Sequence, residues 1–122
     1  MSYEVDGIPQ IDFKQLEELV KDNKTNKIII DVREPDEYEE AHIPNVPLLS
    51  MRNFPMVIEE LDKEKEYVFV CRSGGRSQNV ALFCKENGLQ HVTNYSGGML
   101  SWQGETKSGL EKVITDVKEL YK

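Results

Sequence analysis

The segment VFVCRSGGRSQNVALFCKENG, residues 68–88, decides the fold because its pattern changes in the middle. An apolar run ends at Cys71, two glycines and two arginines follow at once, and apolar residues then recur at helical spacing up to Gly88. The β-branched and aromatic run predicts a buried strand over 66–71. The later spacing predicts a helix that begins near Arg76 and ends before Gly88.

The same alternation continues on both sides of this segment. KIIIDV (27–32) and HVTNY (91–95) predict two further strands, and Pro35 stands where a helix prefers to start. Asp12 precedes an apolar stripe at helical spacing, which predicts a helix over 12–22. Strands that alternate with helices indicate an α/β fold with a central, mostly parallel sheet flanked by helices.

Three further elements are expected from shorter signals. Residues 46–49 indicate a brief strand, and GGMLSWQG (97–104) a turn with a short helical piece. A helix with Pro55 near its start would share one apolar face among Met51, Val57, Ile58 and Leu61. We therefore expect one domain over 1–104.

The tail after Gly104 carries a separate pattern. Its apolar residues recur at helical spacing opposite a charged face. They are Leu110, Val113, Ile114, Val117, Leu120 and Tyr121. We predict an amphipathic C-terminal helix within 105–122 that packs on the same domain, with docking on a partner or on a second copy as the alternative.

Composition narrows the classes of function. With 122 residues the chain suits one domain, and no run approaches the ~18 apolar residues of a membrane span. A formal net charge of -7 argues against nucleic acid as a partner, because phosphate binding requires a basic surface. The first ten residues lack the basic start and apolar core of a secretory signal, so we expect a cytoplasmic protein with no membrane association.

Cys71 is the candidate nucleophile. Its place between a strand and a helix puts it beside backbone N–H groups that have no intrahelical partner, and the helix dipole adds partial positive charge there. Gly74 and Gly75 allow the main chain to turn tightly and approach a bound anion. Such a nest, with Arg76 nearby, is expected to favour the thiolate over the thiol.

Other reactive residue types receive structural interpretations. Cys84 lies more than two turns down the predicted helix, roughly 12 Å from the loop, so we interpret it as core. His42 and His91 are assigned no catalytic role, and Asp31 and Arg33 are expected to tie the end of their strand by hydrogen bonds. No CxxC motif or Cys/His cluster is present, so neither a metal nor another cofactor is expected.

The sequence resembles the single-domain rhodaneses from about Ile8 to Gly104. Four pieces carry the resemblance: IIIDVREPDEYEEAHIP (28–44), VFVCRSGGRS (68–77), GLQHVTNYSGG (88–98) and Trp102, which we interpret as core or pocket wall. Asn45 replaces a glycine usual in the family, and asparagine tolerates the left-handed backbone needed there.

The resemblance implies a sulfurtransferase. A donor such as thiosulfate would pass its outer sulfur to Cys71, and a thiophilic acceptor, cyanide or a thiol, would remove it; a protein persulfide donor or acceptor is equally compatible. The implied site is Cys71 with the loop residues Arg72, Ser73, Gly74, Gly75, Arg76 and Ser77. Backbone amides from Ser73 to Ser77 would surround the transferred sulfur, Arg72 would face the mouth, and Arg76 would support the loop and its charge.

Two alternatives stay open at this point. Phosphatases and arsenate reductases of related fold resemble this chain in having a cysteine loop, but their arginine follows after five residues, whereas Arg76 follows Cys71 after four. The second alternative is a non-catalytic binding module on the same scaffold, which would have little reason to keep Cys71 and its loop intact.

Overall fold

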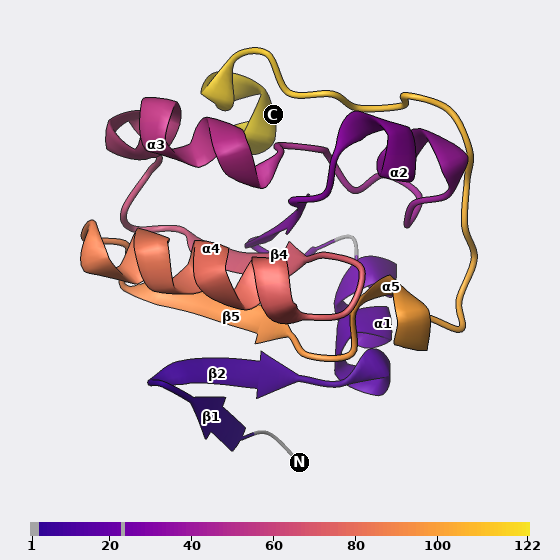
Figure 1. Ribbon diagram of the computed structural model, residues 1–122, viewed down its shortest axis with the longest axis horizontal. Helices are drawn as coiled ribbons and strands as arrows, with labels where there is room; N and C mark the ends of the chain where they lie inside the picture. The colour runs from indigo at the N-terminus through magenta and orange to yellow at the C-terminus, as the bar shows by residue number, and fades with distance from the viewer. Residues whose placement is uncertain (1–2, 23) are drawn as a thin grey trace.

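The computed structural model describes residues 3–22 and 24–122, which form one sheet with helices on both faces (Figure 1). The strands are β1 (Tyr3–Val5), β2 (Ile8–Ile11), β3 (Lys27–Asp31), β4 (Glu66–Val70) and β5 (His91–Tyr95). The α-helices are α1 (Phe13–Lys21), α2 (Pro35–Glu40), α3 (Phe54–Val57), α4 (Gly75–Glu86) and α5 (Gly98–Ser101). Three 3-10 helices complete the described part: η1 (Met51–Asn53), η2 (Ile58–Glu60) and η3 (Val117–Tyr121).

The sheet has the strand order β1-β2-β5-β4-β3, and every pair except β1 with β2 is parallel. β4 is thus an interior strand. Asp31 pairs with Val70, so β3 and β4 end side by side. Because the loops after parallel strands leave from the same edge, the segments after Asp31 and Val70 meet there.

Residues of β4 alternate between two apolar clusters on opposite faces of the sheet. Tyr67 and Phe69 pack in a cluster with residues of α4, α3 and η3, whereas Val68 and Val70 pack in a cluster with residues of α1 and the α5 region. A strand turns successive side chains to opposite faces, which explains this division. Burial of each large apolar side chain stabilises the fold by roughly 1.5–3 kcal/mol, so both layers hold β4 in place.

Local signals set the starts of the helices much as the sequence predicts. The Asp12 side chain accepts the Gln15 N–H, and the Gln15 side chain accepts the Asp12 N–H, which forms a capping box before α1. Pro35 is the first residue of α2. Strands β3, β4 and β5 and helices α1, α2, α4 and α5 are therefore confirmed.

The region between α2 and β4 is less regular than predicted. The expected strand over 46–49 is wrong, because Leu48 forms only isolated bridges, with Asp31 and with Val113. The expected single helix is divided into η1, α3 and η2. Pro55 lies in the first turn of α3, where its missing N–H is tolerated, and this limits how far a helix can extend backwards.

The C-terminal helix predicted within 105–122 is wrong over most of its length. Residues 105–116 run as an extended strap past α2, and the chain becomes helical only in η3 (Figure 1). The backbone of the strap forms hydrogen bonds with the segment after α2: the Lys107 N–H donates to His42 O, and the Leu48 N–H donates to Lys112 O. Gly109 has a φ of 96°, which no α-helix permits.

The end of the chain nevertheless packs on its own domain. Val117 and Leu120 are buried in the same cluster as Phe69. The Tyr121 hydroxyl lies 2.6 Å from the Tyr67 hydroxyl. The apolar residues at helical spacing therefore divide. Those of the C-terminal turn and Ile114 pack on the cluster, whereas Leu110 and Val113 of the strap are exposed.

Candidate active site

Cys71 is the first residue after β4, and its side chain is fully buried. Among the described residues, two donors lie within hydrogen-bonding distance of its Sγ: the Gly74 N–H at 3.1 Å and the Ser77 hydroxyl at 3.2 Å. Both are at the start of α4, where free N–H groups and the helix dipole supply partial positive charge. The sulfur therefore lies at the electropositive N-terminus of α4.

Two glycines allow the main chain to close around this sulfur. Gly74 has a φ of 97°, and a Cβ there would collide with the Ser96 carbonyl oxygen. Gly98 has a φ of 61°, and a Cβ there would collide with the backbone at Arg72. The cysteine loop and the turn after β5 therefore pack backbone against backbone.

The N-terminal turn of α5 supports the loop by hydrogen bonds. The Met99 N–H donates to Cys71 O at 2.8 Å, and the Leu100 N–H donates to Arg72 O at 3.0 Å. The loop is thus held between α4 and α5. The amides between Ser73 and Ser77, apart from that of Gly74, make no hydrogen bond with Sγ, so their role around a transferred sulfur stays a prediction.

The two arginines of the loop lie differently. Arg72 and Ser73 are exposed, and the expectation that Arg72 faces the mouth of the site stays a prediction. Arg76 instead donates two hydrogen bonds to the Glu37 carboxylate, at 2.7 and 2.8 Å. Arg76 therefore ties α4 to α2, and part of its charge is balanced by Glu37.

Glu37 is a site residue that the sequence interpretation missed. Its hydrogen bonds with Arg76 are the largest cause that lowers the pKa of this carboxyl to about 2, and burial opposes them. The pairing raises the pKa of Arg76 in turn. A signal was available, because α2 and α4 follow neighbouring strands and an acidic first turn of one helix faces a basic first turn of the other.

Asp31 and Arg33 form the tie that was predicted at the end of β3. Arg33 donates to both carboxylate oxygens of Asp31 through Nε and Nη2, at 2.8 to 3.1 Å, and Nη2 also donates to Ala41 O. Both side chains are buried. Because these contacts fix the backbone after β3, the pair shapes the chain that leads to α2.

Neither histidine lies in the cysteine loop. His42 is buried and stacked on Tyr38, and its Nε2 lies 2.9 Å from the Glu111 carboxylate. His91 is exposed and pairs with Glu66 at the start of β4, the opposite end from Cys71. Their contacts are structural.

Cys84 and Trp102 also have structural surroundings. Cys84 is a buried, free thiol in the α4 cluster, and burial raises its pKa to about 12. Its interpretation as core is confirmed. Trp102 packs edge-on against Phe13 of α1 and donates its indole N–H to Glu105 O. Trp102 is partly buried and packs against the apolar cluster that contains Val68 and Val70.

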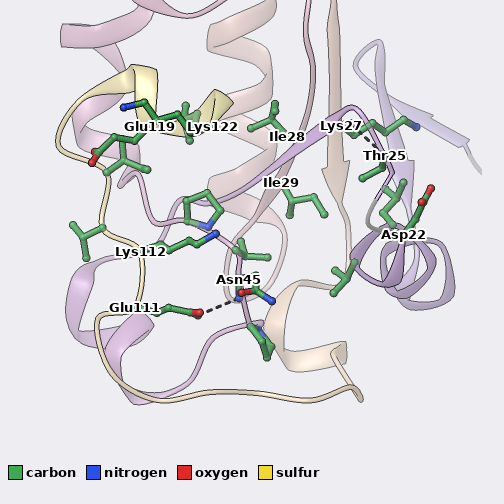
Figure 2. Close-up of a pocket in the computed structure, with 18 residues that line it drawn as sticks. Asp22, Thr25, Lys27, Ile28, Ile29, Asn45, Glu111, Lys112, Glu119 and Lys122 are labelled. Atoms are coloured by element: carbon green, nitrogen blue, oxygen red, sulfur yellow. Dashed lines mark hydrogen bonds between the residues drawn. The ribbon is translucent and has the colours of Figure 1, made fainter.

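A cavity of about 690 Å³ lies away from the cysteine loop. Figure 2 shows it between β3, the turn at Asn45, the end of α1 and the C-terminal strap. Its labelled side chains mix both charges, and Glu111 accepts a hydrogen bond from the Asn45 N–H across one side. No residue of the loop from Cys71 to Ser77 lines this cavity, so it is separate from the candidate active site.

The described residues offer neither a membrane span nor a metal site. No described helix has both the length and the apolar character needed to span a bilayer. Within residues 3–22 and 24–122, no group of three or more His, Cys, Asp or Glu side chains is placed to hold a metal ion.

The family model of the rhodanese-like domain matches residues 12–105, which include the Arg76–Glu37 and Asp31–Arg33 pairs and the whole cysteine loop. The chain belongs to the rhodanese-like domain family. Its similarity to curated relatives is substantial. It is 51% identical over 79 residues to "Putative sulfurtransferase YtwF" of Bacillus subtilis, which covers 65% of this chain and 76% of that protein.

Two other relatives differ in how much of their length is matched. "Thiosulfate sulfurtransferase GlpE" of Coxiella burnetii is 40% identical over 77% of this chain and 86% of its own length. "Putative sulfur carrier protein YrkF" of Bacillus subtilis is 36% identical over 83% of this chain, but the match spans only 54% of that protein. The rhodanese-like domain is thus one part of a longer relative in the second case.

Solved structures agree with the family assignment. A rhodanese-like domain protein from Staphylococcus aureus superposes with a TM-score of 0.71 at 30% identity, over 81% of this chain and 96% of that one. A rhodanese-related protein from Thermoplasma volcanium gives a TM-score of 0.70 at 27% identity, over 84% and 98%. The α/β architecture with a mostly parallel sheet is therefore that of the family.

Proposed function

We propose that this rhodanese-like protein is a sulfurtransferase in which Cys71 Sγ carries a sulfane sulfur from a donor to a thiophilic acceptor. One observation carries the proposal. Sγ lies at the N-terminus of α4, in contact with the Gly74 N–H and the Ser77 hydroxyl, inside a loop in which Arg76 follows Cys71 after four residues.

Sulfur transfer requires only the Cys71 thiolate, a sulfur donor and an acceptor. With thiosulfate as donor, the Cys71 thiolate attacks the outer sulfur, a new S–S bond forms, and the old S–S bond breaks as sulfite leaves with the electron pair. The acceptor, cyanide or a thiolate, then attacks the terminal sulfur and releases the Cys71 thiolate. The Cys71 thiolate that attacks the donor and the persulfide that the acceptor attacks are both anions. The N-terminus of α4 favours negative charge in both forms.

The size of the loop supports sulfur over phosphate as the transferred group. A terminal persulfide sulfur is a single atom with one negative charge, so a few backbone donors can surround it as an oxyanion hole surrounds oxygen. A tetrahedral oxyanion needs a wider ring of donors. The short spacing between Cys71 and Arg76 therefore favours a sulfurtransferase over a phosphatase or an arsenate reductase.

The donor and acceptor classes rest on the surroundings of the loop and on the relatives. Exposed Arg72 next to the buried sulfur suits the collection of a small anionic donor. The name of the Coxiella relative supports thiosulfate as a donor, and that of YrkF, a putative sulfur carrier protein, supports a protein as sulfur donor or acceptor.

A direct test is to incubate the reduced protein with thiosulfate and to map added sulfur by peptide mass spectrometry. We expect one added sulfur on Cys71, released by cyanide as thiocyanate. Cys71→Ala should abolish the adduct, and Cys84→Ala, which removes the buried core thiol, should retain it. An aryl phosphate assay runs in parallel.

The outcomes separate the three hypotheses. Phosphate release without added sulfur would replace the proposal by a phosphatase. Neither signal, from a folded protein, would replace it by a non-catalytic binding module.

A further inference from the structure

A chain of amide side chains, buried at Asn94 and Gln10 and half-buried at Gln78, connects the cysteine loop to the N-terminal hairpin. Ser77 Oγ lies 2.5 Å from Asn94 Oδ1, and Asn94 Nδ2 donates to Gln10 Oε1 at 2.9 Å. Gln10 Nε2 donates to Gln78 Oε1 at 2.7 Å, and Gln78 Nε2 donates to Val5 O at 2.9 Å. Ser77, Asn94 and Gln10 are 0%, 2% and 2% exposed, so water does not compete for the two bonds that join these three side chains.

Backbone carbonyls fix the direction of every amide in this chain. A carbonyl oxygen only accepts, so Gln78 and Gln10 turn their NH₂ groups to Val5 O and Ile8 O. Gln10 then presents its oxygen to Asn94. Asn94 therefore donates from its NH₂ group to the Gln10 oxygen, and its Oδ1 faces Ser77.

The Ser77 hydroxyl has one hydrogen for three acceptors. Asn94 Oδ1 is at 2.5 Å and Cys71 Sγ is at 3.2 Å. Gly74 O, at 3.3 Å, already accepts from the Gln78 N–H and from Asn94 Nδ2. Asn94 Oδ1 lies nearer to the hydroxyl than Sγ does, and among the described residues Ser77 is its only hydrogen-bond donor, so this amide oxygen takes the hydrogen.

We propose that Asn94 is a positioning residue that draws the Ser77 hydrogen away from Cys71 Sγ. The Gly74 N–H then remains as the fixed donor to the sulfur. This inference rests on the proposed function for its significance. A thiolate with fewer hydrogen bonds is a stronger nucleophile, whereas Sγ of the persulfide is uncharged and needs no second donor. The amide chain therefore favours the sulfur-loaded form.

The test measures alkylation of Cys71 by iodoacetamide as a function of pH, which requires no sulfur transfer. Asn94→Leu removes the competing acceptor, so Ser77 turns to the thiolate. We expect the pH midpoint of alkylation to fall by about one unit and the limiting rate at high pH to decrease. Thr93→Val, a change of similar size on the same strand and outside the amide chain, should leave both unchanged.

A double variant shows whether the effect passes through the hydroxyl. In a Ser77→Ala background, Asn94→Leu should no longer lower the midpoint, because no hydroxyl remains to turn. A midpoint unchanged or raised by Asn94→Leu, or a fall that persists without Ser77, overturns the proposal. If Asn94→Leu does not fold, the double variant Gln10→Met, Asn94→Leu removes both partners of the buried bond between these two side chains. The pH midpoint of Cys71 alkylation is then expected to fall in this double variant as it would in Asn94→Leu alone.

The charged groups around Cys71 are the same in all these variants. They are the Arg76–Glu37 and Asp31–Arg33 pairs and exposed Arg72. A change in midpoint therefore reports the direction of the hydroxyl. Because alkylation does not depend on a sulfur donor, a protein that fails to accept sulfur from thiosulfate can still confirm the role of Asn94, and the two failures are distinguishable.

Discussion

Arg76 and Glu37 form a bidentate ion pair, at 2.7 and 2.8 Å, that joins the first turns of the two helices after β3 and β4. The pair places a balanced charge, and not a free cation, beside the cysteine loop. Arg76 therefore holds the start of α4 in place, and its electrostatic effect on Cys71 is moderated by Glu37.

Replacing Glu37 by Gln should unmask the charge of Arg76. An unpaired guanidinium favours the thiolate, so we expect the pH midpoint of Cys71 alkylation to fall by roughly 0.5 unit, more at low salt than at high salt. Glu40→Gln removes the same charge from an exposed position of α2 and is the matched control. An equal fall in both variants would show that net charge alone is responsible.

The two adjacent glycines of the loop should differ sharply in their tolerance of alanine. Gly74→Ala places a side chain in the left-handed region and against Ser96 O, so we expect a loss of about 2–4 kcal/mol in the free energy of unfolding. Gly75 has open space at its Cβ and lies in α4, so Gly75→Ala should stabilise by about 0.5–1 kcal/mol. Urea denaturation measures both; equal losses would contradict the backbone contact between Gly74 and Ser96.

Much of the site could be predicted because its signals are local. The apolar run before Cys71, the glycines after it and the helical spacing up to Gly88 lie within one continuous segment, and each favours the same strand, turn and helix. The left-handed backbone expected at Asn45 is confirmed, with a φ of 70°. When local preferences agree with the fold in this way, the structure of a segment can be predicted from its sequence alone.

The features that escaped prediction depend on contacts between distant segments. β2 contains Pro9 and a buried Gln10, which do not suggest a strand until β5 lies beside it. The partnership of Gln10 with Asn94 spans 84 residues. The same holds for the strap, whose helical spacing was overridden by pairing with the backbone of His42 and Leu48.

Acid should weaken the fold through two carboxyls. The pKa of Glu37 and that of Glu111 are both lowered to about 2, chiefly by hydrogen bonds from Arg76 and from His42. A lowered pKa in the folded state means that the stabilisation is complete above the ordinary range of glutamate, ~4.3, and is lost as the pH falls toward about 2.

In Glu111→Gln, the free energy of unfolding is expected to fall less as the pH is lowered. Urea unfolding at about pH 5 and about pH 3 measures it, because the variant has no carboxyl to protonate at His42. Glu40→Gln, exposed and without an ion pair among the described residues, should retain the slope of the parent protein. An unchanged slope in Glu111→Gln would show that the His42 contact contributes little.

Two leucines of the tail should differ in how much they contribute to stability. A continuous amphipathic helix would bury both of them, whereas the observed strap and C-terminal turn bury only one. Leu120 is 8% exposed and packs in the cluster of Phe69, whereas Leu110 is 51% exposed. Leu120→Ala should therefore lower the free energy of unfolding by about 2–4 kcal/mol, and Leu110→Ala should change it by less than about 0.5 kcal/mol. Chemical denaturation of both variants, with alkylation of Cys71 as a check that the loop is intact, measures the difference. Comparable losses at the two positions would mean that the tail packs along its whole length, as the helical spacing alone suggests, since only a continuous buried face accounts for an equal effect at Leu110.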